Sequence, residues 1–227
     1  MALLLSVAGS AWAQNTGTVT VQGSVQKAAA LRWWDFTANN SETGTNADAG
    51  SGANTQNDPL SFTLDVGDVA AGNNLNDFAG GSVDIALRSN SAYELAAQVT
   101  SSSGFGTNSA EDIVISDIGF GVTGLAASGS GAKVNPAAVT GSSITVGFSS
   151  DPTAAPTDAD GEPTYSADFS DLSASTTVLT GPRISYRGGR NSPNNALLAT
   201  TAYAVVPQYY TPTAAWSATV TYTLTTP

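Results

Sequence analysis

The stretch SVDIALRSNSAYELAAQVT, residues 82–100, decides the fold class of this 227-residue chain. Apolar side chains alternate with polar or small ones on both sides of its Ser-Asn-Ser cluster, at Val83, Ile85 and Leu87 and then at Tyr93, Leu95, Ala97 and Val99. Successive side chains of a strand point to opposite faces, so a period of two indicates a strand with one buried face. The polar cluster between the runs supplies turn residues. The stretch therefore predicts two β-strands.

The same period of two recurs along the chain, whereas helical periodicity is almost absent. Further alternating runs lie at 19–25, 60–66, 144–148, 184–186 and 216–224, with clusters of Gly, Asn, Ser, Asp and Pro between them. Long surface loops are expected at 38–58, 125–136 and 149–163. Many short strands without crossover helices predict an all-β fold, an immunoglobulin-like Greek-key β-sandwich.

Residues 1–13 have the pattern of an export signal. Residues 2–8 form an apolar run with one Ser, and Ala11-Trp12-Ala13 fits the small-x-small rule for cleavage. No positively charged segment precedes the apolar run, so Met1 is either an internal start or the first residue of a truncated signal. We therefore expect an exported protein of a bacterial cell surface, with residues 14–227 forming one domain that carries an N-terminal extension at 14–25. No run is long enough to predict a membrane span in the mature chain.

Composition excludes several kinds of chemistry. The formal net charge of −11 disfavours nucleic acid as a partner, because its phosphates are also negative. The chain has no His and no Cys, which excludes a Ser/His/Asp triad, a Cys/His dyad and disulfides. No pair of carboxylates stands out as a glycosidase acid and base, and a carbohydrate-active enzyme is only a third hypothesis. We therefore expect a structural protein that is not an enzyme and needs no cofactor.

Asp158-Ala159-Asp160-Gly161-Glu162 is the one candidate metal site. Alternating carboxylates around a Gly that permits a bend are typical of part of a calcium loop. Asp158, Asp160 and Glu162 are the candidate ligands, although the twelve-residue ligand series is incomplete. The alternative interpretation is an acidic turn without metal.

Arg183, Arg187 and Arg190 concentrate positive charge in an acidic chain. They are candidate interface residues, which would contact an acidic patch on a neighbouring subunit or an anionic glycan. On a strand, Arg183 and Arg187 share one face, while Ile184 and Tyr186 share the other. The alternative is a solvated edge strand that its charges protect from aggregation.

Trp33 and Trp34 are adjacent on a predicted strand, so their side chains should point to opposite faces. Only one of them then enters the core. The other either covers an interface or packs beneath the loop at 38–58. Both tryptophans are therefore candidate interface residues.

Two segments resemble the chaperone/usher fimbrial subunits, the type 1-like pilins. GTVTVQGSV at 17–25 resembles their opening strand, and residues 209–224 resemble their closing strand. The resemblance implies a sandwich that lacks its last strand and is completed by the N-terminal extension of the next subunit. Val19, Val21, Gly23 and Val25 would be the donor-strand residues of a pilus-like filament that acts in cell adhesion. The alternative is that 17–25 is the first strand of its own sandwich.

A second resemblance covers part of the same sequence. Residues 217–227, with Tyr93-Glu94-Leu95 upstream, are similar to the Trp-x-Leu cell-wall-binding domains, with Tyr in place of Trp in both segments. This resemblance implies a non-catalytic surface domain that binds peptidoglycan or another glycan.

Overall fold

The computed structural model describes residues 29–36, 40–42, 62–64, 78–128, 133–186, 196–213 and 215–227, the first three of these ranges as backbone only. The strands are β1 (Ala29–Phe36), β2 (Asn40–Glu42), β3 (Phe62–Leu64), β4 (Ala79–Ser89), β5 (Tyr93–Ser103), β6 (Gly119–Ala127), β7 (Thr145–Val146), β8 (Thr176–Gly181), β9 (Leu197–Val205) and β10 (Ser217–Thr225). Helical segments are short: α1 (Ala137–Thr140) and the 3-10 turns η2 (Ile115–Asp117), η3 (Pro152–Ala154) and η4 (Phe169–Leu172). The described part is thus all-β, as predicted, and none of its helices could cross a membrane.

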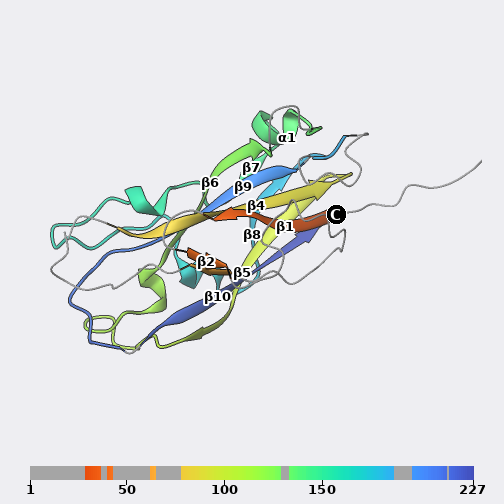
Figure 1. Ribbon diagram of the computed structural model, residues 1–227. Helices are drawn as coiled ribbons and strands as arrows, with labels where there is room; N and C mark the ends of the chain where they lie inside the picture. Colours follow the sequence, from red (N-terminus) through yellow and green to blue (C-terminus); the bar gives the residue numbers. More distant parts are fainter. Residues whose placement is uncertain are drawn as a thin grey trace, which may run out of the picture.

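Two four-stranded antiparallel sheets form the two layers of the structure (Figure 1). The first sheet has the order β1-β4-β9-β6 and the second has the order β10-β5-β8-β7, while β2 and β3 pair separately. The two strands of the 82–100 stretch therefore do not pair with each other. The short turn between β4 and β5 carries the chain from the first sheet to the second.

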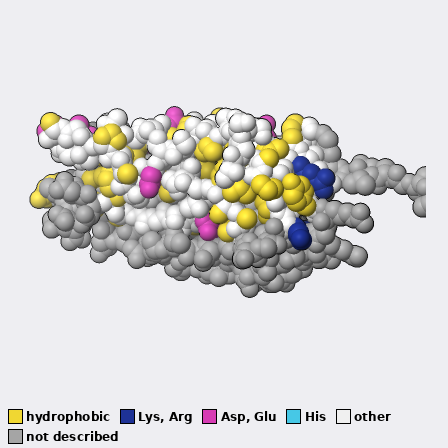
Figure 2. All heavy atoms as spheres, turned by 90° about the horizontal axis from the view of Figure 1, so that it is seen from above, with side chains coloured by type: hydrophobic (Ala, Val, Ile, Leu, Met, Phe, Trp, Pro, Cys, Tyr) yellow, Lys and Arg dark blue, Asp and Glu magenta, His cyan; other side chains and the backbone are white. Residues whose placement is uncertain are grey.

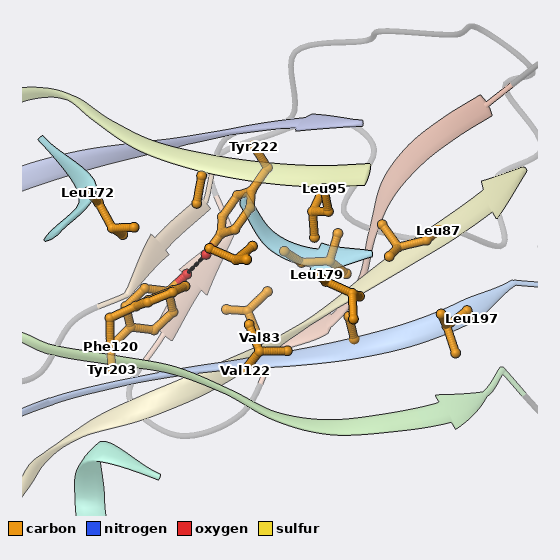
Figure 3. Packing of buried hydrophobic residues seen from close by; sticks show 14 of the residues in the cluster. Val83, Leu87, Leu95, Phe120, Val122, Leu172, Leu179, Leu197, Tyr203 and Tyr222 are labelled. Atoms are coloured by element: carbon orange, nitrogen blue, oxygen red, sulfur yellow. Dashed lines mark hydrogen bonds between the residues drawn. The ribbon is translucent and has the colours of Figure 1, made fainter. Parts of the chain in front are cut away.

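One hydrophobic core lies between the two sheets (Figure 3). Most alternating residues of the 82–100 stretch are buried as predicted, since Val83, Ile85, Leu87, Leu95 and Ala97 are all 0% exposed, whereas Val99 is only partly buried. Other strands contribute Val122 from β6, Leu179 from β8, Leu197 and Tyr203 from β9, and Tyr222 from β10. Burial of these side chains holds the layers together without any disulfide.

Strand register defines two ends of the sandwich. At one end β4 finishes and β5 begins, and pairing with β5 brings the last residues of β8 and β10 to the same end. β1 begins there as well, because Ala29 pairs with Ser89. We call this the basic end, since it carries the described Lys and Arg side chains, Arg88, Lys133 and Arg183 (dark blue in Figure 2). We call the opposite end, where β5 finishes and β6 begins, the acidic end.

Three predictions about strands are wrong in detail. Strand β6 continues through Leu125–Ala127, so the loop predicted at 125–136 begins later. Residues 184–186 form only an isolated bridge, between Ser185 and Val134. The run at 144–148 forms only the two-residue strand β7, although the Gly147 N–H still bonds to the Val178 carbonyl oxygen of β8. Alternation over three to five residues is therefore too short to predict a strand in this chain.

The loop predicted at 149–163 packs against the first sheet. Pro152 is buried, and the Tyr165 hydroxyl donates to the Ala204 carbonyl oxygen at 3.2 Å. A Cβ atom added to Gly119 would overlap the Tyr165 ring, and one added to Gly121 would overlap the Ser150 carbonyl oxygen. The glycines of β6 therefore allow this segment to cover the outer face of the sheet.

Candidate functional site

Strand β10 forms one edge of the second sheet. It pairs with β5 along its whole length, from Ser217 opposite Ser103 to Thr225 opposite Glu94. Among the described residues no strand pairs with its other side, which we call the open edge. Strand β1, an edge strand of the first sheet, lies close to β10 on this side of the sandwich (Figure 1). Backbone N–H and C=O groups along an uncovered edge are available to an added strand.

The inner face of β10 is incompletely covered. Ala218, Val220, Tyr222 and Leu224 alternate with exposed Ser and Thr and pack against the core. Of these four side chains only Tyr222 is buried, and the other three are partly exposed. Apolar surface thus remains beside the open edge, and a further strand would remove it from water.

The other side of the sandwich is closed in the described residues. Two later segments of the chain are hydrogen-bonded to the outer edge of β6. The Val122 N–H donates to the Phe148 carbonyl oxygen at 2.6 Å, and the Phe120 N–H donates to the Ala167 carbonyl oxygen at 3.0 Å. Strand β7, the other edge strand on that side, has two residues. Covered or very short edges resist strand addition. Among the described strands, the long edges without a paired strand are those of β1 and β10, and side chains are described only for β10.

Tyr222 ties the open-edge strand to the first sheet. Its hydroxyl lies 2.6 Å from the Tyr203 hydroxyl of β9, which lies 3.2 Å from Thr201 Oγ1 (Figure 3). Thr201 Oγ1 donates in turn to the Val83 carbonyl oxygen at 3.2 Å. Burial raises the pKa of the Tyr203 and Tyr222 hydroxyls, so both stay protonated at neutral pH. The link is a polar clamp across the core, which sequence alone did not predict.

Several predicted site residues lie outside the described part. These are the proposed donor residues Val19, Val21, Gly23 and Val25, together with Arg187 and Arg190. Trp33 lies on β1 and pairs with Ile85 of β4. The register shifts between Trp33 and Asp35, which places Trp34 at a β-bulge. A bulge interrupts the alternation from which opposite orientations of the two tryptophans were predicted. The side chains of both tryptophans are also outside the described part.

Arg183 is exposed at the basic end, immediately after β8. Its Nε donates to the Ser185 carbonyl oxygen at 2.7 Å. The strand faces predicted here are wrong, because Ile184 is fully buried while Tyr186 is 45% exposed. The Ile184 and Ser185 N–H groups both donate to the Ser89 carbonyl oxygen, which fixes this segment to the end of β4. Arg183 is therefore an exposed charged residue on a segment that hydrogen bonds fix to the end of β4.

The candidate calcium ligands lie in a hydrogen-bonded turn. Asp158 Oδ1 accepts the N–H groups of Asp160 and Glu162, each at 2.9 Å. Gly161 has φ +87°, a conformation that favours Gly. Within the described ranges, no group of three potential ligands is arranged to hold a metal ion. These contacts are those of the acidic-turn alternative.

Asp117 is a half-buried carboxyl at the acidic end, where it accepts the Val114 N–H at 2.7 Å. Burial raises the pKa of Asp117, and the negative charges of Glu162 and Asp168 raise it further, while the hydrogen bond from Val114 opposes the shift. These residues are far apart in the sequence, and no local pattern brings them together. The ionised form of Asp117 therefore lowers the stability of the fold.

The stability of the protein should fall as pH rises through the titration of Asp117. A carboxyl whose pKa is higher in the folded state binds its proton more tightly there, so its penalty is absent below the unfolded-state pKa and complete above the folded-state pKa. We expect Asp117→Asn, which keeps an oxygen for the Val114 N–H, to be more stable than wild type at pH 7. The two should converge near pH 3, as measured by urea unfolding. Asp160→Asn is the matched control, and an equal gain in that variant would contradict the assignment to Asp117.

Comparisons with known proteins add no relative. No protein-family model matches the chain, and no curated protein or solved structure matches it. Function is therefore inferred from the open edge, the hydrogen bonds between Tyr222, Tyr203 and Thr201 across the core, and the charges of the two ends.

Proposed function

We propose that the chain is an exported structural protein that assembles into pilus-like filaments at a bacterial cell surface, by adding a strand of one copy to β10 of the next. The proposed fold is an immunoglobulin-like Greek-key sandwich whose last strand is supplied by the neighbour. The observation that carries the proposal is the open edge, a nine-residue strand with half-covered apolar side chains and no described partner on one side.

The donor is proposed to be GTVTVQGSV, residues 17–25. Val19, Val21 and Val25 would cover the exposed parts of Val220 and Leu224, with Gly23 where less space remains. Burial of three valines contributes at most roughly 5 to 8 kcal/mol. Main-chain hydrogen bonds to the open edge add to this and set the register.

Chain length favours addition between copies when the added strand is antiparallel. Such a donor would place residue 25 beside the start of β10, at the acidic end. The same chain must begin β1 at Ala29, at the basic end, because Ala29 pairs with Ser89. Four residues reach about 14 Å at most, whereas nine strand residues span about 27 Å. An antiparallel donor on this edge must therefore come from a second copy.

Deletion of residues 14–25 should abolish filaments and leave the fold intact. The deletion removes the proposed donor but none of the described core. We expect unchanged thermal unfolding and dispersed particles by negative-stain microscopy, whereas the mature chain forms filaments under the same conditions.

A synthetic peptide of residues 17–25 should bind the deleted protein. The control peptide carries Ser at Val19, Val21 and Val25, which keeps the backbone but removes the apolar contacts, and it should bind at least about tenfold more weakly. Filaments formed by the deleted protein, or equal binding of the two peptides, would rule out this donor.

A wall- or glycan-binding surface domain is the alternative function. The two Tyr-x-Leu segments that suggest it lie on paired strands, with Leu224 opposite Leu95. Their tyrosines are buried, at 2% exposure for Tyr93 and 8% for Tyr222, so they support the fold and do not present a glycan-binding surface. Sedimentation with purified peptidoglycan distinguishes this alternative from strand addition.

A further inference from the structure

The charged side chains of the described residues are divided between the two ends of the sandwich. Arg88, Lys133 and Arg183 lie at the basic end. Apart from Asp84 within β4 and Glu94 near the basic end, the described carboxylates belong to the loops of the acidic end: Glu111, Asp112, Asp117, Asp151, Asp158, Asp160, Glu162, Asp168 and Asp171. In Figure 2 the dark-blue side chains gather at the end where Figure 1 marks the C-terminus, away from most of the magenta ones.

The basic end is held by hydrogen bonds between two segments. Asn135 Nδ2 donates to the Arg183 carbonyl oxygen at 2.7 Å, and the Tyr186 N–H donates to the Lys133 carbonyl oxygen at 3.0 Å. Lys133 and Arg183 are both exposed side chains on this fixed backbone. Positions fixed in this way lose less conformational entropy when they meet a partner.

The acidic end is held in the same manner by carboxylates that bind their own turns. Asp168 Oδ1 accepts the Ser170 N–H at 2.6 Å, and Asp151 Oδ1 accepts the Thr153 N–H at 2.9 Å. Asp160 and Glu162 are exposed on the turn that Asp158 closes. The loops therefore present a negative surface of defined shape.

We propose that copies of this chain dock end to end, with the basic end of one copy on the acidic end of the next. Opposite potentials attract and orient the two surfaces, while the net charge of −11 makes other approaches between copies repulsive. Both surfaces are on the same chain, so the partner is a second copy. A contact between two different surfaces does not close on itself and produces an open filament.

The proposed strand addition would also place the basic end of one copy against the acidic end of the next, although the charge argument does not depend on it. An antiparallel donor puts residue 25 at the acidic end of the acceptor, and residue 29 of the donor copy lies at that copy's basic end. Strand addition would thus bring together the two ends that attract each other.

The test uses two charge-reversal variants of the full mature chain. Lys133→Glu with Arg183→Glu makes both ends negative, and Asp160→Lys with Glu162→Lys reverses the charge of the exposed turn at the acidic end while keeping Asp158, which closes that turn. Each variant alone should lose association at 20 mM salt by about tenfold or more, and a 1:1 mixture should recover it, as followed by sedimentation velocity. Thr123→Glu adds negative charge to an exposed position of β6, away from both ends and from β10, and is the control, which should associate like wild type.

Wild-type association should also weaken between 20 mM and 500 mM salt, because screening acts on exposed charges. Absence of association at low salt, association that salt leaves unchanged, or a mixture that stays dispersed would overturn end-to-end docking. Strand addition is tested separately by the 17–25 peptide, so either proposal can fail while the other holds.

Discussion

Tyr222→Ala should destabilise the protein by about 3 to 5 kcal/mol, the usual cost of removing a buried aromatic side chain. Tyr222 is the one buried side chain of β10, and its hydroxyl joins the chain of hydrogen bonds through Tyr203 and Thr201 to the first sheet. Without it, β10 keeps its ladder with β5 but loses its attachment across the core. Urea unfolding measures the loss, and hydrogen exchange should show that residues 217–225 open more readily than the rest of the second sheet.

Tyr222→Phe separates the ring from the hydroxyl. It keeps the packing and removes the hydrogen bond to Tyr203, and Tyr203 retains Thr201 as a partner, so a loss of about 1 kcal/mol is expected. Thr221→Ala is the control at the neighbouring exposed position. If Tyr222→Ala costs no more than Thr221→Ala, Tyr222 does not anchor the strand, and the open edge is less well fixed than the proposed function requires.

Alternation in the sequence predicts β4, β5 and β10, which bury one face, and misses β9, which buries both. The sequence of β9, LLATTAYAV, has no such alternation because nearly all of it is buried. Its outward-facing Leu198 packs with Ala86 and Ala196 in a second cluster, outside the main core. A strand covered on both faces cannot be recognised by a period of two.

The candidate site was predictable only in part, for a related reason. The inner face of β10 follows from alternation at Val220, Tyr222 and Leu224. Whether a strand lies at an edge depends on which distant segments pair beside it, and a single sequence does not specify that pairing. The bond between Tyr222 and Tyr203 joins the two sheets, and the division of charge between the ends depends on the register of both sheets. Spacing along the chain carries neither kind of information.

Gly121→Ala should destabilise the protein by about 3 kcal/mol, at the upper end of the usual cost of overpacking. The added Cβ would overlap the Ser150 carbonyl oxygen, which is backbone and cannot be relieved by a rotamer change. Relief requires the 148–152 segment to move, and this movement strains the 2.6 Å hydrogen bond from the Val122 N–H to the Phe148 carbonyl oxygen. The closed edge of the sandwich would then open, and urea unfolding with hydrogen exchange at Val122 measures both effects.

Gly124→Ala is the matched control on the same strand. There the nearest atom to an added Cβ is Thr200 Oγ1 at 3.2 Å, which belongs to a side chain that can shift by a few tenths of an ångström. Ala also restricts the unfolded chain more than Gly, so this variant should lie within about 1 kcal/mol of wild type. Equal stability of the two variants would mean that the 148–152 segment does not press on β6. The outer edge of β6 would then be as accessible as that of β10, and strand addition could not be assigned to one side of the sandwich.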